Sequence, residues 1–221
     1  GAELYAQQER MENFLARRGY PDATVAIESR STDDTLRVVL VLVVTPGEPR
    51  VLDARVFYVV SGNDREIRNV TSTYRVKTRD RADEVALETA DTELEGKLHG
   101  RGYYGAKVSH DVVRFRDQVT LRIRIDAGPK IIPKFEGNDS YDDDALTEAL
   151  DLEAETDLNP TRLADKLRDF YRKRGFYDAE ITVEERGGPR DLVQHQVFKI
   201  MESSRVSVTG RSYPCLKVDE I

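Results

Sequence analysis

The stretch Arg-Gly-Phe-Tyr-Asp-Ala at residues 174–179 has two earlier versions in the chain, Arg-Gly-Tyr-Tyr-Gly-Ala at 101–106 and Arg-Gly-Tyr-Pro-Asp-Ala at 18–23. The last two versions lie 73 residues apart. A glycine in the left-handed conformation can end a helix, and an aromatic residue directly after it can fold back on the last helical turn. The pattern therefore predicts three helix ends, each at the same place in a repeated unit.

A second sequence mark keeps nearly the same interval. Gly62, Gly137 and Gly210 each follow a short apolar run, and they are separated by 75 and 73 residues. Two marks with one spacing indicate an internal repeat of roughly 75 residues, which is typical of arrays of small domains.

Helix signals surround these marks. Asn159 is the expected N-cap of a helix that has Pro160 at its first position and ends near residue 174. The same pattern predicts helices over about 6–18 and about 81–101. Ser140 is the expected cap of a shorter helix whose first turn holds Asp142, Asp143 and Asp144. In the preceding repeat, poor helix formers over 70–76 predict only a short helical turn followed by extended chain.

Strand signals follow each long helix. Apolar and polar residues alternate over 107–113 and 119–126, which predicts a hairpin that turns near Arg116 and Asp117. Similar pairs are expected over 181–183 with 193–200, and over 25–27 with 36–44. The unbroken apolar run Val38 to Val44 predicts a strand that is covered on both faces. Short strands over 51–60, 131–135 and 206–208 open the units that follow.

The expected fold class is therefore α+β, with repeats ordered strand, helix, helix, strand, strand. Each repeat is expected to form a three-stranded mixed sheet backed by two helices, and the repeats are expected to form an elongated arm in which each contacts mainly its neighbours. The predicted domains are a partial unit at 1–48 that lacks its first strand and helix, complete units at 49–127 and 128–202, and the truncated start of a further unit at 203–221.

Composition and charge exclude several classes of protein. The 221 residues carry a formal net charge of -7 at pH 7, which disfavours a general nucleic-acid binder. The longest apolar run has seven residues, whereas a membrane-spanning helix needs about 20. Cys215 is the one cysteine of the chain, so no intramolecular disulfide can form. A chain that opens Gly-Ala-Glu without an initiator methionine is expected to be a fragment of a longer protein.

The repeat resembles the POTRA (polypeptide-transport-associated) family. The best match is the third unit, with Phe-Glu-Gly-Asn at 135–138, Leu-Asn-Pro at 158–160, Leu163, and the run from Tyr171 to Ala179. The second unit matches at Gly62-Asn63 and Gly102-Tyr103 but departs in its first helix. The first unit matches only in its second half.

This resemblance implies the periplasmic arm of an outer-membrane barrel assembly factor similar to BamA. The implied function is a non-enzymatic scaffold that receives unfolded outer-membrane protein precursors and docks accessory periplasmic lipoproteins. The implied location is the periplasmic side of a bacterial outer membrane, with a C-terminal membrane barrel elsewhere in the same chain and with no nucleic-acid partner or cofactor. The arm of a two-partner secretion or translocation pore is an alternative, and a division protein is a weaker one because the unit is repeated.

The first strand of each hairpin is expected to lie at a sheet edge, where unpaired backbone groups can receive an extended segment. The candidate edges are residues 23–29, 106–113 and 179–185. A proline at Val108 or Ile181 is expected to weaken such pairing if the N–H that it removes faces outward. The predicted client-binding residues are Ala106, Lys107, Val108, Ser109, His110, Asp111, Val112, Ala179, Glu180, Ile181, Thr182 and Val183.

The sequence predicts no catalytic residue and no metal site. Asp139 and the three aspartates at 142–144 lack the alternation and the glycine of a calcium loop, and they fit the start of a helix better. A metal protein or a carboxylate-based enzyme built around Asp142 remains the alternative. His110 and His195 fall on the apolar phases of their strands and are expected to be satisfied core or half-exposed histidines, while His99 lies beside a helix end.

Overall fold

The computed structural model describes residues 2–31, 37–188, 191–207 and 209–210. The chain divides into two compact units, Gly1–Gly128 and Pro129–Ile221. The end of the predicted strand at 206–208 and most of the predicted truncated unit at 203–221, including Cys215, lie outside the described residues. Among the described helices, none has the length and apolar content needed to cross a membrane.

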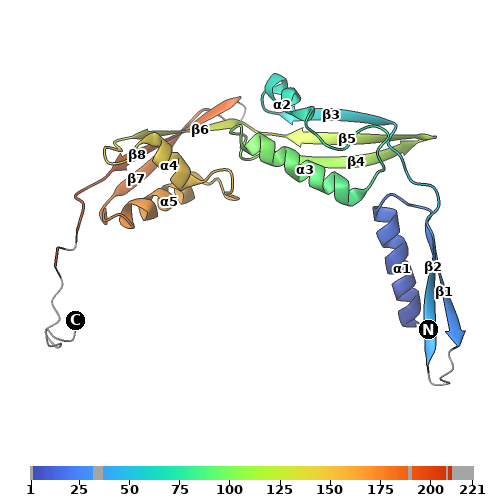
Figure 1. Ribbon diagram of the computed structural model, residues 1–221. Coiled ribbons are helices and arrows are strands. Elements are labelled where there is room, and N and C mark those ends of the chain that lie inside the picture. The colour runs from blue at the N-terminus through green and yellow to red at the C-terminus, as the bar shows by residue number, and fades with distance from the viewer. Residues whose placement is uncertain (1, 32–36, 189–190, 208, 211–221) are drawn as a thin grey trace, which may run out of the picture. The chain divides into compact units, whose positions relative to one another are not determined.

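Figure 1 labels the elements of the first unit, α1 (Ala2–Arg17), β1 (Thr24–Ser31), β2 (Val38–Thr45), β3 (Ala54–Ser61), α2 (Asp64–Thr71), α3 (Glu84–His99), β4 (Lys107–Phe115) and β5 (Gln118–Asp126).

The second unit repeats the arrangement of the last five elements of the first. It contains β6 (Lys130–Glu136), α4 (Asp143–Leu150), α5 (Pro160–Arg172), β7 (Glu180–Arg186) and β8 (Val193–Met201). The strand orders are β3-β5-β4 and β6-β8-β7, and in both sheets the first strand is parallel to the central one while the hairpin is antiparallel. The predicted order of elements and the mixed three-stranded sheet are confirmed in both repeats.

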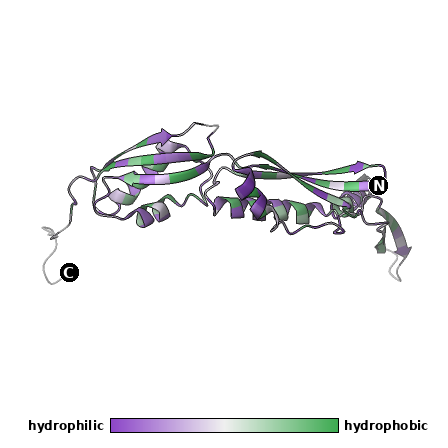
Figure 2. Ribbon diagram, turned by 90° about the horizontal axis from the view of Figure 1, so that it is seen from above, coloured by the Kyte–Doolittle hydropathy of each residue, from purple (hydrophilic) through white to green (hydrophobic). Residues whose placement is uncertain are grey.

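Helices cover one face of each three-stranded sheet (Figure 2). In the first unit, apolar residues of α2 and α3 such as Ile67, Leu87 and Leu94 are buried against Leu121 and Ile123 of β5. In the second unit, Leu146 of α4 and Leu167 of α5 are buried, as are Phe198 and Ile200, which share one face of β8. Each repeat thus has an apolar core of its own.

The three predicted helix ends are confirmed. Gly19, Gly102 and Gly175 all have positive φ, at 88°, 91° and 98°. In each case the N–H of the following aromatic residue donates to the carbonyl of the residue five positions before it, as in Phe176 to Tyr171 at 3.1 Å. The rings of Tyr171 and Phe176 pack edge to face at 5.6 Å. The glycine and the aromatic residue therefore end the helix together.

Some predicted boundaries are wrong. Asp142 is the N-cap of α4, because its carboxylate accepts the Ala145 N–H at 2.9 Å, whereas the hydroxyl and N–H of Ser140 donate to Glu202. In the second repeat, Asn63 caps α2, which ends at Thr71, so most of this helix lies before the segment 70–76 to which the sequence assigned a helical turn and extended chain. Residues 206–207 are irregular and Gly210 lacks a positive φ, so the described part of 206–210 does not repeat the strand and glycine of the other units.

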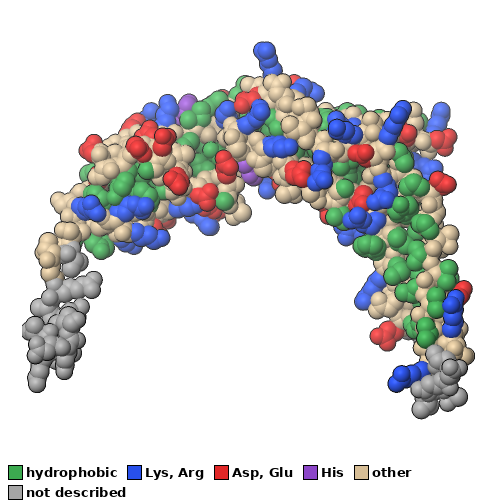
Figure 3. Space-filling model, in the orientation of Figure 1, with side chains coloured by type: hydrophobic (Ala, Val, Ile, Leu, Met, Phe, Trp, Pro, Cys, Tyr) green, Lys and Arg blue, Asp and Glu red, His purple; other side chains and the backbone are tan. Residues whose placement is uncertain are grey.

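The α1–β1–β2 segment differs from the two repeats. Its sheet has two strands, and β2 is exposed along most of its length, with Val38 61% and Val39 50% accessible. The prediction of a strand covered on both faces is therefore wrong, because neither a parallel strand nor a short helix covers β2 within the described residues. Figure 3 shows apolar side chains gathered over this segment.

Polar contacts join α1 to the repeat that follows it within the same unit. Arg18 pairs with the buried Asp83 at 3.1 Å, and Arg81 donates to the Tyr20 hydroxyl at 2.9 Å while its guanidinium lies over the Tyr20 ring. The Arg50 N–H also donates to the carbonyl of Gly19 at 2.8 Å. These contacts attach the end of α1 to the start of α3.

Candidate functional site

The candidate site is the free edge of each three-stranded sheet. Among the described strands, β4 pairs only with β5, and β7 pairs only with β8, so each first hairpin strand is an edge strand within its own sheet. The strands begin at Lys107 and Glu180, one residue after the predicted starts at Ala106 and Ala179. Both alanines are buried and precede the strand.

The hairpin turn defines which amides of β4 face outward. Phe115 pairs with Gln118 across the two-residue turn Arg116-Asp117, so these two residues are the hydrogen-bonded pair that closes the hairpin. Every second residue before Phe115 likewise bonds to β5. The N–H and C=O groups of the residues in between, among them Val112, His110 and Val108, therefore point away from β5. A contact confirms the direction, since the Val108 N–H donates to Oε1 of Glu95 on α3 at 2.6 Å.

The Val108 amide therefore faces outward but is already bonded. A proline there would remove the outward donor as expected, and it would also remove the hydrogen bond to Glu95 and destabilise the start of β4. Any loss of client pairing at this amide would be mixed with a loss of folded stability.

The equivalent residue of β7 also faces the free edge. A Cβ added to Gly137 would lie 2.3 Å from the carbonyl oxygen of Ile200, so this carbonyl points toward β6. Ile200 is the partner of Ile181 in the register, and the two groups of Ile181 must then point away from β8. On that side, the guanidinium of Arg168 donates to the Ile181 carbonyl at 3.3 Å.

The side chains of the two edge strands alternate as predicted. Val108 and Ile181 are buried, while His110, Val112 and Val183 are partly buried. The opposite faces carry exposed polar residues: Lys107, Ser109 and Asp111 on β4, and Glu180, Thr182 and Glu184 on β7. Glu184 pairs with Arg186 and Lys199, which lower the pKa of its carboxyl to about 2. These faces are therefore hydrated and charged.

A buried polar network lies under β4. Oδ2 of Asp91 lies 2.6 Å from Nδ1 of His110, and Oδ1 of Asp91 accepts the hydroxyl of Tyr74 at 2.7 Å. The hydrogen bond to Asp91, with Glu84 on the other ring nitrogen at 3.3 Å, raises the pKa of His110 above its ordinary value. Burial and Asp91 raise the pKa of Tyr74 as well. The prediction that His110 is a satisfied core histidine is confirmed, and the network fastens β4 to α3.

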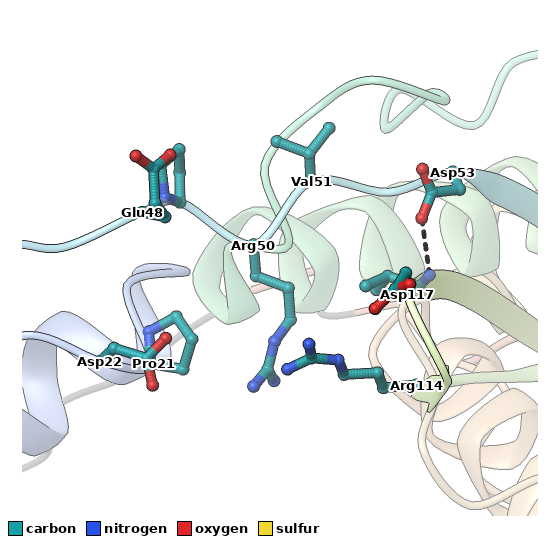
Figure 4. A pocket seen from close by; sticks show the side chains of 10 residues that line it. Pro21, Asp22, Glu48, Arg50, Val51, Asp53, Arg114 and Asp117 are labelled. Carbon is teal, nitrogen blue, oxygen red and sulfur yellow. Dashed lines mark hydrogen bonds between the residues drawn. The ribbon is translucent and has the colours of Figure 1, made fainter.

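A pocket of about 290 Å³ lies beside the first residues of β5, near residues 21–22 and 48–53 (Figure 4). The side chains of Arg50 and Arg114 point toward each other there, and Oδ2 of Asp53 accepts the Val119 N–H at 2.7 Å. Asp22, Glu48 and Asp117 also line the pocket. Its carboxylates outnumber its two guanidinium groups, so the pocket has no excess positive charge with which to select an anion.

The aspartates at 142–144 act at a helix start. Asp142 caps α4, and Asp143 accepts a hydrogen bond from the Asn138 side chain at 3.0 Å. Over the described ranges, no group of three or more His, Cys, Asp or Glu side chains is arranged to hold a metal ion. The alternative of a metal or carboxylate centre around Asp142 has no geometric support there.

Sequence reasoning missed the helix residues that contact the edges, which are Glu12, Glu95 and Arg168. Glu12 accepts the Val25 N–H of β1 at 2.9 Å, as Glu95 does for Val108. Each of the three side chains comes 13 residues before the strand residue that it contacts. These three pairs occupy equivalent positions relative to the repeated glycines. Aligning the units on those glycines could therefore have identified the three helix residues.

The family model POTRA, described as "Surface antigen variable number repeat", matches residues 134–202, which include the end of β6 and all of α4, α5, β7 and β8. Residues 54–126 repeat the strand order, the strand directions and the helix stop of that segment. Residues 134–202 therefore match the POTRA family, and residues 54–126 share the topology of that segment. The segment at 134–202 is also the one that the sequence marks match best.

Solved structures with similarity to this chain include POTRA domains. POTRA3-5 of BamA from Haemophilus influenzae is 18% identical with a TM-score of 0.39, and the match covers 90% of this chain and 80% of that one. POTRA1-2 of the periplasmic domain of Omp85 from Anabaena is 16% identical with a TM-score of 0.37, covering 71% and 98%. CdiB from Escherichia coli is 12% identical with a TM-score of 0.32, covering 93% and 34%. Comparison with curated proteins gives no match.

Proposed function

We propose that this chain is the scaffold arm of an outer-membrane barrel assembly factor, which receives unfolded barrel precursors by strand addition and docks accessory periplasmic lipoproteins. The arm acts on the periplasmic side of a bacterial outer membrane, without a catalytic step or a cofactor. In this proposal the array consists of a partial domain at 1–48, complete domains at 49–127 and 128–202, and the start of another at 203–221.

One observation carries the proposal. Each complete repeat has a hairpin strand, β4 or β7, at the free edge of its sheet, with outward backbone groups and an exposed polar face. Backbone groups at such an edge can pair with an extended segment of almost any sequence. A receptor for many different unfolded chains needs this kind of recognition, because its clients share alternation and extended form more than they share particular residues.

The polar faces make the contact reversible. Charged residues on an edge strand oppose permanent pairing between copies of the same protein, and they leave the backbone as the main source of attraction. Weak and transient binding suits a scaffold that passes its client onward. The POTRA family match and the internal repeat support this function because several equivalent edges in one chain can hold one long client at several points.

The test is an NMR titration of the whole chain with an unfolded peptide taken from one strand of an outer-membrane barrel. We expect amide signals along 107–113 or 180–185 to broaden or shift as the peptide is added. The matched control is the same peptide with two adjacent prolines in the middle of the segment, which removes donors from both of its edges and interrupts the ladder. Equal responses to both peptides, or changes confined to residues outside these edges, would reject strand addition.

A further inference from the structure

One side chain from each long helix contacts the same position on each edge strand. Glu12 accepts the Val25 N–H at 2.9 Å and Glu95 accepts the Val108 N–H at 2.6 Å. In the third hairpin the equivalent residue is Arg168, which donates to the Ile181 carbonyl at 3.3 Å. The three strand residues occupy equivalent places, since each is the second residue paired in its hairpin.

The chemistry of the contact is reversed in the third hairpin. A carboxylate can only accept, so Glu12 and Glu95 occupy backbone donors. A guanidinium can only donate, so Arg168 occupies a backbone acceptor and leaves the donor alone. Within the described part of the chain, the outward N–H of Ile181 has no partner.

An amide held by a carboxylate is a poor site for an incoming strand. A charge-assisted hydrogen bond is stronger than a neutral one, so a client carbonyl would have to displace the carboxylate and leave it unpaired. The Ile181 N–H has no such competitor. An incoming carbonyl can bond to it directly, while the Arg168 side chain, which is 37% accessible, has room to move off the Ile181 carbonyl.

We propose that Glu12 and Glu95 are intramolecular plugs that close the starts of β1 and β4, and that β7 is the edge that an extended client strand enters first, at Ile181. The proposal rests on the function proposed above and adds to it which edge is open and what closes the others. The client that fits is an extended segment whose backbone carbonyl meets the Ile181 N–H.

The plug itself can be tested without any client. We expect Glu95→Ala to speed hydrogen exchange of the Val108 amide by about tenfold or more relative to the amides of β5, since a hydrogen bond to a charged group is lost. Glu93→Ala is the matched control, because Glu93 lies on the same helix and pairs with Arg75 on its surface. Unchanged exchange at Val108 in Glu95→Ala would overturn the plug.

The choice of edge is tested with a peptide that alternates valine and threonine and carries a lysine at each end. In the wild-type chain we expect the amides of Ile181 and Val183 to respond at lower peptide concentration than those of Val108 and Val25. Glu95→Ala should bring Val108 into the responding set. Arg168→Glu, which installs the residue type of the other two helices, should weaken the response at Ile181.

Each result has a definite meaning. A wild-type response at Val108 equal to that at Ile181, or an unchanged Ile181 response in Arg168→Glu, would overturn the proposed order of the edges. If the peptide acts on no edge in any variant, strand addition fails and the entry at β7 fails with it. The exchange rate of Val108 still decides whether Glu95 is a plug, so the two failures can be told apart.

Discussion

β4 and β7 occupy the same place in two sheets of the same topology, yet they are held to their helices by different chemistry. Under β4, His110 binds the buried Asp91 of α3. The positions 73 residues later hold Val183, on β7, and the buried Ala164 of α5. The same fold therefore accepts either a hydrogen-bonded polar pair or two apolar residues at these positions.

The aromatic residues differ as well. In the third repeat, Tyr141, Phe170, Tyr171 and Phe176 pack edge to face, and the guanidinium of Arg174 lies 3.5 Å from the centre of the Phe170 ring. In the second repeat the described ring pair is Phe57 with Tyr74. The comparison teaches that the helix stop and strand order are repeated, while the polar contacts of each repeat are its own.

Among matched substitutions in the two repeats, the largest difference in stability is expected at the glycine that follows the opening strand of each repeat. A Cβ on Gly137 would lie 2.3 Å from the backbone oxygen of Ile200, whereas a Cβ on Gly62 first meets the end of the flexible Ile67 side chain at 2.7 Å. Both glycines have positive φ. We expect Gly137→Ala to cost about 3 kcal/mol and Gly62→Ala about 1–2 kcal/mol in the free energy of unfolding of their own repeats.

Urea unfolding followed by NMR signals of each repeat would measure both changes. Signals of the unaltered repeat in the same molecule provide the internal control. Equal costs for the two substitutions would show that the left-handed backbone, and not the contact with Ile200, decides the loss.

A smaller effect is expected from His110. Its folded pKa is raised by Asp91, so the stabilisation from its protonated form is fully present below the ordinary value of about 6.5 and is lost as pH rises through the folded pKa. We expect the second repeat, but not the third, to lose stability over this window. His110→Gln should remove the pH dependence and cost about 2 kcal/mol at pH 6.

The same urea experiment, repeated from about pH 5.5 upward, checks this expectation. His99→Gln serves as the control, because His99 lies at the end of α3 and contacts the Ala106 carbonyl instead of a carboxylate. A pH dependence that survives in His110→Gln would assign it to another group.

The smallest loss of stability is expected when either of two buried tyrosines loses its hydroxyl. The Tyr103 hydroxyl donates to Glu66 and the Tyr171 hydroxyl donates to Glu202, each at 2.9 Å. Burial and Glu66 raise the pKa of Tyr103 to about 12, so both hydroxyls are protonated donors at neutral pH. We expect Tyr103→Phe and Tyr171→Phe each to cost about 1 kcal/mol, as measured by urea unfolding.

In Tyr171→Phe, Glu202 keeps its hydrogen bonds from the N–H and hydroxyl of Ser140, so its carboxylate is not left without a partner. A clearly larger cost for Tyr171→Phe would mean that the edge-to-face packing around Tyr171 depends on its hydroxyl.

Features that depend on a few neighbouring residues could be predicted from the sequence. The ends of the long helices, the Asn159 cap and the alternation of β4 and β7 are set by glycine geometry, side-chain capping and period-two patterning. The choice of Asp142 over Ser140 as a cap could not be predicted in this way, because Glu202, from the other end of the domain, binds Ser140.

The remaining errors have the same cause. The residues from Val38 to Val44 have the composition of a strand that is covered on both faces. Their exposure depends on which elements pack beside the strand, and these seven residues alone do not determine that. The contact of Glu95 with Val108 joins a helix surface to a strand edge, so neither residue is unusual alone. The candidate edges could be predicted, whereas the residues that close them required coordinates.

The carbonyl groups of two helix-stop glycines have a second partner. The Arg50 N–H donates to Gly19 and the Val206 N–H donates to Gly175, both at 2.8 Å and both from a residue 31 positions further along the chain. One peptide group thus ends the helix and also fastens the segment that leaves the hairpin. Any residue except proline at positions 50 and 206 keeps this attachment, because the donor is a backbone N–H; the position 31 residues after Gly102 is Pro133, which has none.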